Sequence, residues 1–245
     1  MKPNVEISSV KATFATYAGV AVSILTPNRV GEFAGRMLFI NPDKRPTAIT
    51  MSLAGSISQL MVTLIIGGLF AGIHSYQLGL FEWWYVLIGS VILGGSTFLY
   101  FNISKSDKIL SRWKDNPNIV NAREALSSLH SSKLLEALLI SGIRYTVFSL
   151  QLGLLIFGLV DLTPSFDPSA LFVIVPIYFL AQTIIPTIAL SEIGVRGMIL
   201  ATLFTEIASG SDLLITSTLL WLINIVGPAI MGGISLLNLK FRLYK

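Results

Sequence analysis

Four long, predominantly apolar stretches limit what this chain can fold into. They cover residues 46–73, 81–101, 134–160 and 212–236 of a 245-residue sequence. A bilayer's hydrocarbon core is about 30 Å thick, so about 20 apolar residues in a helix cross it. Charged residues are only 12% of the chain, about half the share in soluble domains. The sequence therefore predicts an all-α, polytopic membrane protein with about four full spans.

The positive charges in the loops predict an orientation. Short cytoplasmic loops are enriched in Lys and Arg. The connector 102–132 carries five such residues and the C-terminal tail carries three, whereas the loops 74–79 and 161–167 carry none. We therefore expect a multi-pass protein of the cytoplasmic (inner) membrane, with the connector and the C-terminus in the cytoplasm. The connector is also amphipathic, which predicts an interfacial segment, with an ordinary solvated loop as the alternative.

Two further apolar regions, residues 8–40 and 168–208, are interrupted near their middle. Loop charges place both ends of the first region inside and both ends of the second outside, so each must cross an even number of times. Proline and glycine break helices, and the arm 30–40, about 16 Å of helix, is too short to span alone. The sequence predicts two re-entrant helical hairpins, one from each face. The expected tip residues are Pro27, Gly31, Pro186 and Gly194.

The order of these segments predicts an inverted-topology repeat. The later part of the chain contains two spans, a hairpin and a final span, whereas the earlier part contains only a hairpin and a span in the opposite orientation. Inverted repeats place binding sites near the bilayer midplane, where broken helices meet. The pattern also suggests that two N-terminal spans are missing from this sequence, and a homodimer could then cover the exposed half-unit.

Six charged residues are expected at membrane depth, where each costs about 2.5–3.5 kcal/mol at the bilayer centre on insertion scales. Guanidinium groups and the free N–H groups of helix N-termini bind phosphate well, and nearby carboxylates can balance them. We predict an anion-binding site, although the charged pairs could instead only hold the hairpins in place. The candidate residues are Arg29, Glu32, Arg36, Arg144, Glu192 and Arg196.

Signatures of enzymes are missing from the sequence. It contains no cysteine, and its two histidines, His74 and His130, are 56 positions apart without metal-ligand spacing. No Gly-rich phosphate loop or nucleophile motif is present. The net charge of +4 lies mainly in loops, which suits a membrane surface rather than nucleic acid. We expect no enzymatic activity, no metal and no cofactor.

Two stretches resemble the signatures of a known family. "LTPNRVGEFAGRMLF" and "PTIALSEIGVRGMIL" are similar to the two motifs of the flippase-like membrane domain found in bacterial lysylphosphatidylglycerol synthases. The second stretch departs from the pattern: Ala189 and Leu190 stand where glycines are common, and Gly197 stands where an acid is common. The resemblance implies paired re-entrant helices around a central lipid cavity, and movement of anionic, aminoacylated or polyprenyl-linked lipids.

The leading functional hypothesis is a lipid flippase or lipid transporter that holds an anionic headgroup at a midplane cavity. A small-solute secondary transporter could use the same broken helices. A third reading is a partner subunit in envelope lipid synthesis that transports nothing itself. The aminoacyl-transferring domain of the lysyl-lipid synthases is absent from the sequence, so lysyl-lipid synthesis by this chain is not expected.

Overall fold

A computed structural model describes residues 8–24, 26, 29–79, 82–106, 117–164, 166–185, 187, 189–204 and 208–243. Every regular element in these ranges is helical, which confirms the predicted all-α class. The main helices are α1 (Ser9–Ser23), α2 (Gly31–Met37), α3 (Arg45–Gln77), α4 (Trp83–Phe101), α6 (Pro117–Ser127), α7 (Ser131–Leu159), α8 (Leu171–Ile184), α9 (Ala189–Leu203), α10 (Gly210–Trp221) and α11 (Gly227–Leu243). A π-helical segment, Leu222–Val226, joins α10 to α11.

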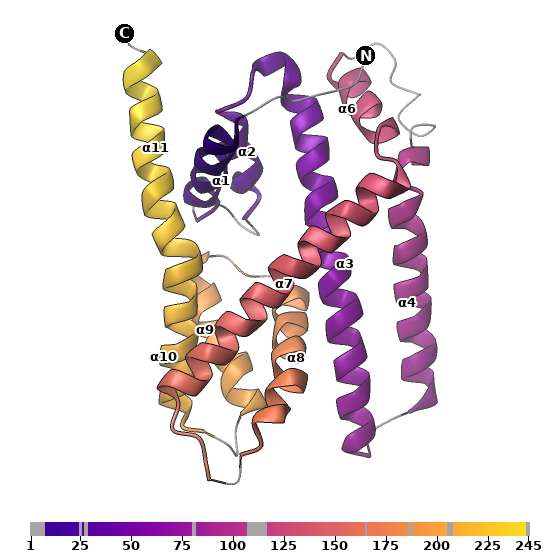
Figure 1. Ribbon diagram of the computed structural model, residues 1–245, viewed down its shortest axis with the longest axis vertical. Coiled ribbons are helices and arrows are strands. Elements are labelled where there is room, and N and C mark those ends of the chain that lie inside the picture. Colours follow the sequence, from indigo (N-terminus) through magenta and orange to yellow (C-terminus); the bar gives the residue numbers. More distant parts are fainter. Residues whose placement is uncertain are drawn as a thin grey trace.

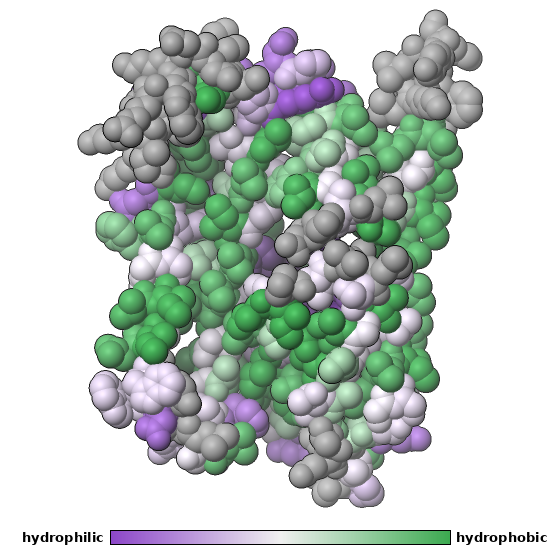
Figure 2. Space-filling view, turned by 180° about the vertical axis from the view of Figure 1, so that it is seen from behind, coloured by the Kyte–Doolittle hydropathy of each residue, from purple (hydrophilic) through white to green (hydrophobic). Residues whose placement is uncertain are grey.

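Three helical segments within the described residues are long and apolar enough to cross a membrane. They are Pro42–Gln77, Ser131–Leu159 and Gly210–Leu237. Leu87–Phe101 and Pro168–Ile184 are shorter apolar helices. Apolar residues cover the middle of the face shown in Figure 2, and hydrophilic residues gather toward its two ends. The structure therefore indicates a membrane protein.

Two pairs of short helices lie in opposite halves of the molecule (Figure 1). The pair α1–α2 lies in the half that contains the C-terminus, beside α11. The pair α8–α9 lies in the other half, beside α3 and α10. The helix α7 runs diagonally across the molecule (Figure 1) and packs on α3. We call α1–α2 the first hairpin and α8–α9 the second hairpin.

Glycines let the first hairpin pack closely on itself and on α11. A Cβ atom added at Gly35 would lie 2.5 Å from the carbonyl oxygen of Ala18, and one added at Gly19 would lie 2.7 Å from that of Glu32. A Cβ atom at Gly232 of α11 would overlap the carbonyl group of Tyr17. Backbone therefore meets backbone here, as small residues allow in membrane helices.

Polar side chains join the longer helices. The hydroxyl group of Tyr100 in α4 lies 2.7 Å from Oγ of Ser58 in α3 and donates to the carbonyl oxygen of Leu134 in α7 at 2.8 Å. In the π segment, Nδ2 of Asn224 donates to Oε1 of Gln151 in α7 at 3.0 Å. This bond links the π segment to α7, as single polar side chains do between membrane helices.

The structure also refines the predicted breaks. The sequence predicted that Gly194 lies at the tip of the second hairpin. In the structure α8 ends at Ile184 and α9 begins at Ala189, so Gly194 lies inside α9. Gly31 is the first residue of α2. Pro27 and Pro186 lie outside the described residues, as does most of the first half of the connector 102–132.

Candidate functional site

A cavity of about 530 Å³ lies between α3, α7, the second hairpin and the residues that connect α1 to α2. We call it the first cavity. Charged and uncharged polar side chains share its wall with aromatic and aliphatic ones. The polar lining consists of Arg29, Gln59, Thr63, Tyr145, Gln182, Thr183, Thr187, Glu192 and Arg196. Arg29 from the first motif and Glu192 and Arg196 from the second motif thus line one cavity.

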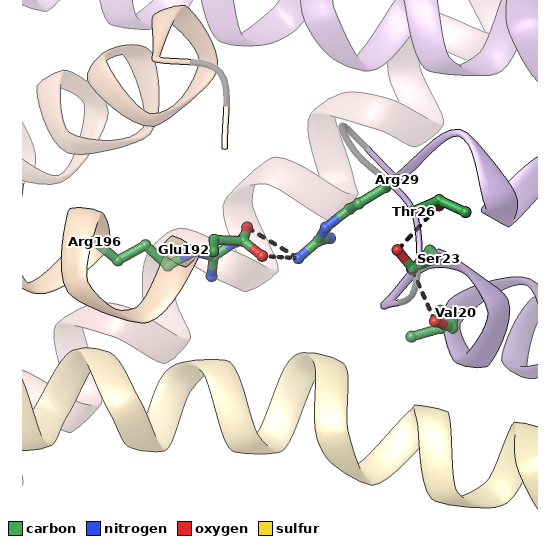
Figure 3. Close-up of polar contacts among 6 residues, drawn as sticks. All are labelled: Val20, Ser23, Thr26, Arg29, Glu192 and Arg196. Atoms are coloured by element: carbon green, nitrogen blue, oxygen red, sulfur yellow. Dashed lines mark hydrogen bonds and ion pairs between the residues drawn. The ribbon is translucent and has the colours of Figure 1, made fainter. Parts of the chain in front are cut away.

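Three of these charged residues form a bridge between the hairpins (Figure 3). Nη2 of Arg29 donates to both carboxylate oxygens of Glu192, at 2.8 and 3.0 Å. Arg196, one turn further along α9, also donates to Glu192. The Glu192 side chain is 11% exposed and that of Arg29 is 36% exposed. One buried carboxylate is therefore shared by two guanidinium groups that are far apart in the sequence.

The tip of the first hairpin holds Arg29 in place. Oγ1 of Thr26 donates to the carbonyl oxygen of Ser23 at the end of α1 (Figure 3) and accepts from the backbone N–H of Gly31 at the start of α2, at 2.8 Å. Arg29 has φ of 57°, in the left-handed region, which non-glycine residues seldom adopt. The hydroxyl of Thr26 thus fixes a strained turn that directs Arg29 toward the second hairpin.

A second cavity, of about 570 Å³, lies between α2, α3 and α7. Glu32, Arg36 and Arg144 contribute the charged part of its lining. Glu32 and Arg36 form an ion pair within α2, and the guanidinium carbon of Arg144 lies 5.3 Å from the centre of the Phe148 ring. Gln59 lines both cavities. Each cavity therefore contains two arginines and one glutamate.

Several buried polar atoms in these cavities lack a hydrogen-bond partner among the described residues. They include Oε1 of Gln59 and the Nε atoms of Arg36 and Arg196. Leaving such an atom unpaired costs about 1–3 kcal/mol, and a bound anion or water can satisfy the two guanidinium N–H groups. With two cations and one anion, each cavity carries a net charge of +1, which attracts an anion.

All six candidate charged residues line one of the two cavities. The first cavity brings together Arg29, Glu192 and Arg196, and the second brings together Glu32, Arg36 and Arg144. The sequence reasoning missed the role of Thr26, although a threonine shortly before a helix start is a recognised capping signal. Within the described residues, no three His, Asp or Glu side chains lie close enough to hold a metal ion.

The fold and the site define a helical membrane protein with charged internal cavities. No protein-family model, curated protein or solved structure matches the chain.

Proposed function

We propose that this chain binds the anionic headgroup of a lipid in the first cavity and moves that lipid between the two leaflets. The observation that carries the proposal is the bridge of Arg29, Glu192 and Arg196, because it puts two guanidinium groups into one partly buried cavity. Guanidinium binds phosphate through paired N–H donors. A phosphate that takes the place of the Glu192 carboxylate as their partner would keep both arginines paired.

The proposal includes the membrane topology. The two hairpins would enter from opposite faces as re-entrant elements of an inverted repeat, with the termini and the connector 102–132 in the cytoplasm. Their placement in opposite halves of the molecule (Figure 1) supports this arrangement. So does a shared pattern: Glu32 and Glu192 each lie in the first turn of a hairpin helix, and each pairs with an arginine four residues later.

The resemblance of both motifs to the flippase-like membrane domain supports the same function. On this proposal a headgroup binds in the two cavities one after the other. Gln59, which lines both cavities, would contact the headgroup in each. Alternating access then needs the bridge between the hairpins to open and close, since Arg29 and Glu192 belong to different hairpins.

A lipid-movement assay tests the proposal. The full chain is reconstituted into phosphatidylcholine vesicles with a trace of fluorescent phosphatidylglycerol, and the label is quenched from outside. Wild-type protein should make inner-leaflet label accessible. A double variant, Arg29→Ala with Arg196→Ala, should slow this at least tenfold. Lys133→Ala, which removes an exposed cation at the start of α7, should leave the rate unchanged.

Three outcomes would contradict the proposal. A normally folded double variant with the wild-type rate would assign the charges a structural role only. If wild-type protein moves no anionic lipid, the proposed flippase activity is excluded. Uptake of radiolabelled inorganic phosphate without any movement of lipid would point instead to a small-solute transporter.

A further inference from the structure

An apolar groove adjoins the first cavity. It has a volume of about 470 Å³ and lies between α8 and α9. Its lining residues are Ala181, Ile185, Val195, Met198, Ile199, Thr202 and Leu203. The one hydroxyl group among them belongs to Thr202 and donates to the carbonyl oxygen of Met198 at 2.8 Å. The groove therefore presents hydrocarbon to whatever occupies it.

The groove and the first cavity share a wall. Ile185 lines both of them. On α9, positions 195, 198, 199 and 202 form one helical face toward the groove, and positions 192 and 196 form the adjoining face toward the cavity. On α8, Ala181 lines the groove, and Gln182, the next residue, lines the cavity. The second hairpin thus presents a charged face and an apolar face side by side.

The groove is open at its edge. Met198, one of its lining residues, is 69% exposed. In a membrane, the open edge of the groove would therefore face lipid. A ligand that reached Arg196 from this side would keep an apolar portion between α8 and α9. A free phosphate or another small hydrophilic ion would gain nothing from this surface.

We propose that the ligand of the first cavity is an anionic lipid and that one of its hydrocarbon chains occupies the α8–α9 groove. The groove and the cavity adjoin at Ile185, which lines both of them. This adjacency and the positive charge of the cavity favour a hydrocarbon chain attached to an anion as the occupant of the groove. This inference rests on the proposed function, because it assumes that the arginines hold the headgroup. The inference adds that the α8–α9 groove makes the protein prefer anions that carry a hydrocarbon chain.

A chain-length series tests the inference. Glycerol 3-phosphate and lysophosphatidic acids with acyl chains of six and eight carbons are titrated into the full chain in a neutral maltoside detergent, and affinity is measured by microscale thermophoresis. Each buried CH2 group adds about fourfold to affinity. Wild-type protein should bind the eight-carbon ligand about fifteenfold more tightly than the six-carbon ligand after correction for partition into empty micelles.

Two groove-filling variants distinguish a chain-length gain that comes from the groove from one that comes from partition into detergent. Ala181→Trp on α8 and Thr202→Trp on α9 both add bulk to the groove. Each should reduce the gain per two carbons to less than threefold while leaving the affinity for glycerol 3-phosphate unchanged. Phe172→Trp is the matched control, since Phe172 is 74% exposed on α8 and does not line the groove. It should behave as wild type.

The same titrations distinguish failure of the inference from failure of the proposed function. If Arg196→Gln abolishes binding of every ligand but both groove variants keep the full chain-length gain, the groove assignment is wrong and the anion site stands. Wild-type affinity that does not rise with chain length has the same meaning. If no ligand in the series binds wild-type protein, both the proposed function and the groove assignment fall.

Discussion

The two hairpins use the same charged pattern but are packed in different ways. The helices α1 and α2 meet through glycines, with Gly35 against the backbone of Ala18, and Thr26 fixes their connection. In the second hairpin, an apolar groove separates parts of α8 and α9, and nothing lies within 4 Å of a Cβ atom placed at Gly194. The first hairpin is closely packed, whereas the second leaves space beside its charges.

The glycines should give the largest difference between the hairpins. Gly35→Ala puts a methyl group 2.5–2.8 Å from backbone atoms of α1 and should destabilise the protein by about 3 kcal/mol, as overpacking does. Gly194→Ala meets open space inside a helix and should be neutral or stabilise by up to about 1 kcal/mol. Thermal unfolding followed by size-exclusion chromatography measures both. Equal losses for the two variants would show that the packing difference is not real.

The bridge between the hairpins should give the next largest effect. Glu192→Gln leaves Arg29 and Arg196 without a counter-charge, and we expect a loss of about 2 kcal/mol, below the 3–5 kcal/mol of fully buried pairs because Arg29 is partly exposed. A double-mutant cycle with Arg29→Gln measures the coupling. A coupling energy near zero in the cycle would mean that the hairpins do not interact through this pair.

The tip of the first hairpin should give a smaller effect. Thr26→Ala removes the acceptor for the Gly31 N–H and should destabilise the protein by about 1 kcal/mol, as loss of a helix cap does. Thr26→Ser keeps the hydroxyl group and should retain most of the stability. Both are compared by thermal unfolding. A serine variant as unstable as the alanine variant would assign the effect to the lost methyl group.

The ion pair within the first hairpin should give the smallest effect. Glu32 and Arg36 are four residues apart on α2 and only half-buried, so Glu32→Gln should cost about 0.5 kcal/mol. The ratio of the Glu192→Gln and Glu32→Gln losses in thermal unfolding compares the two carboxylates directly. A ratio near one would contradict the view that the carboxylate of Glu192, which pairs across the two hairpins, contributes more to stability than that of Glu32, which pairs within α2.

The apolar runs were sufficient to predict the helical class and three of the four long stretches as helices long enough to cross a membrane. The fourth stretch, 81–101, contains only the shorter apolar helix Leu87–Phe101 among the described residues. Hydrophobic length alone determines these features. They were also sufficient to predict interruptions near residues 27 and 186, because proline and glycine act locally. The position of the second break was less predictable. Gly194 lies inside α9, because a single glycine costs a helix only about 1 kcal/mol and does not by itself end it.

The charged residues of the site were predictable, but the ion pair that joins the two hairpins was not. Spacing alone predicts the pairs Glu32–Arg36 and Glu192–Arg196, which are one turn apart. The pair Arg29–Glu192 joins residues 163 positions apart and depends on where two tips meet. That meeting depends on the left-handed backbone of Arg29 and on the hydroxyl group of Thr26. Neither follows from hydrophobic periodicity.

The π-helical segment Leu222–Val226 affects which side of the C-terminal helix α11 faces its neighbours. In a regular α-helix one extra residue turns everything after it by about 100°, whereas a π turn takes up such a residue and largely keeps the phase of the helix that follows. Inserting one alanine after Ala229, in the regular part of α11, would therefore turn Gly232 away from Tyr17 and bring Met231 against the first hairpin. We expect that insertion to disturb the first hairpin, and protease accessibility at residues 24–30 would reveal it.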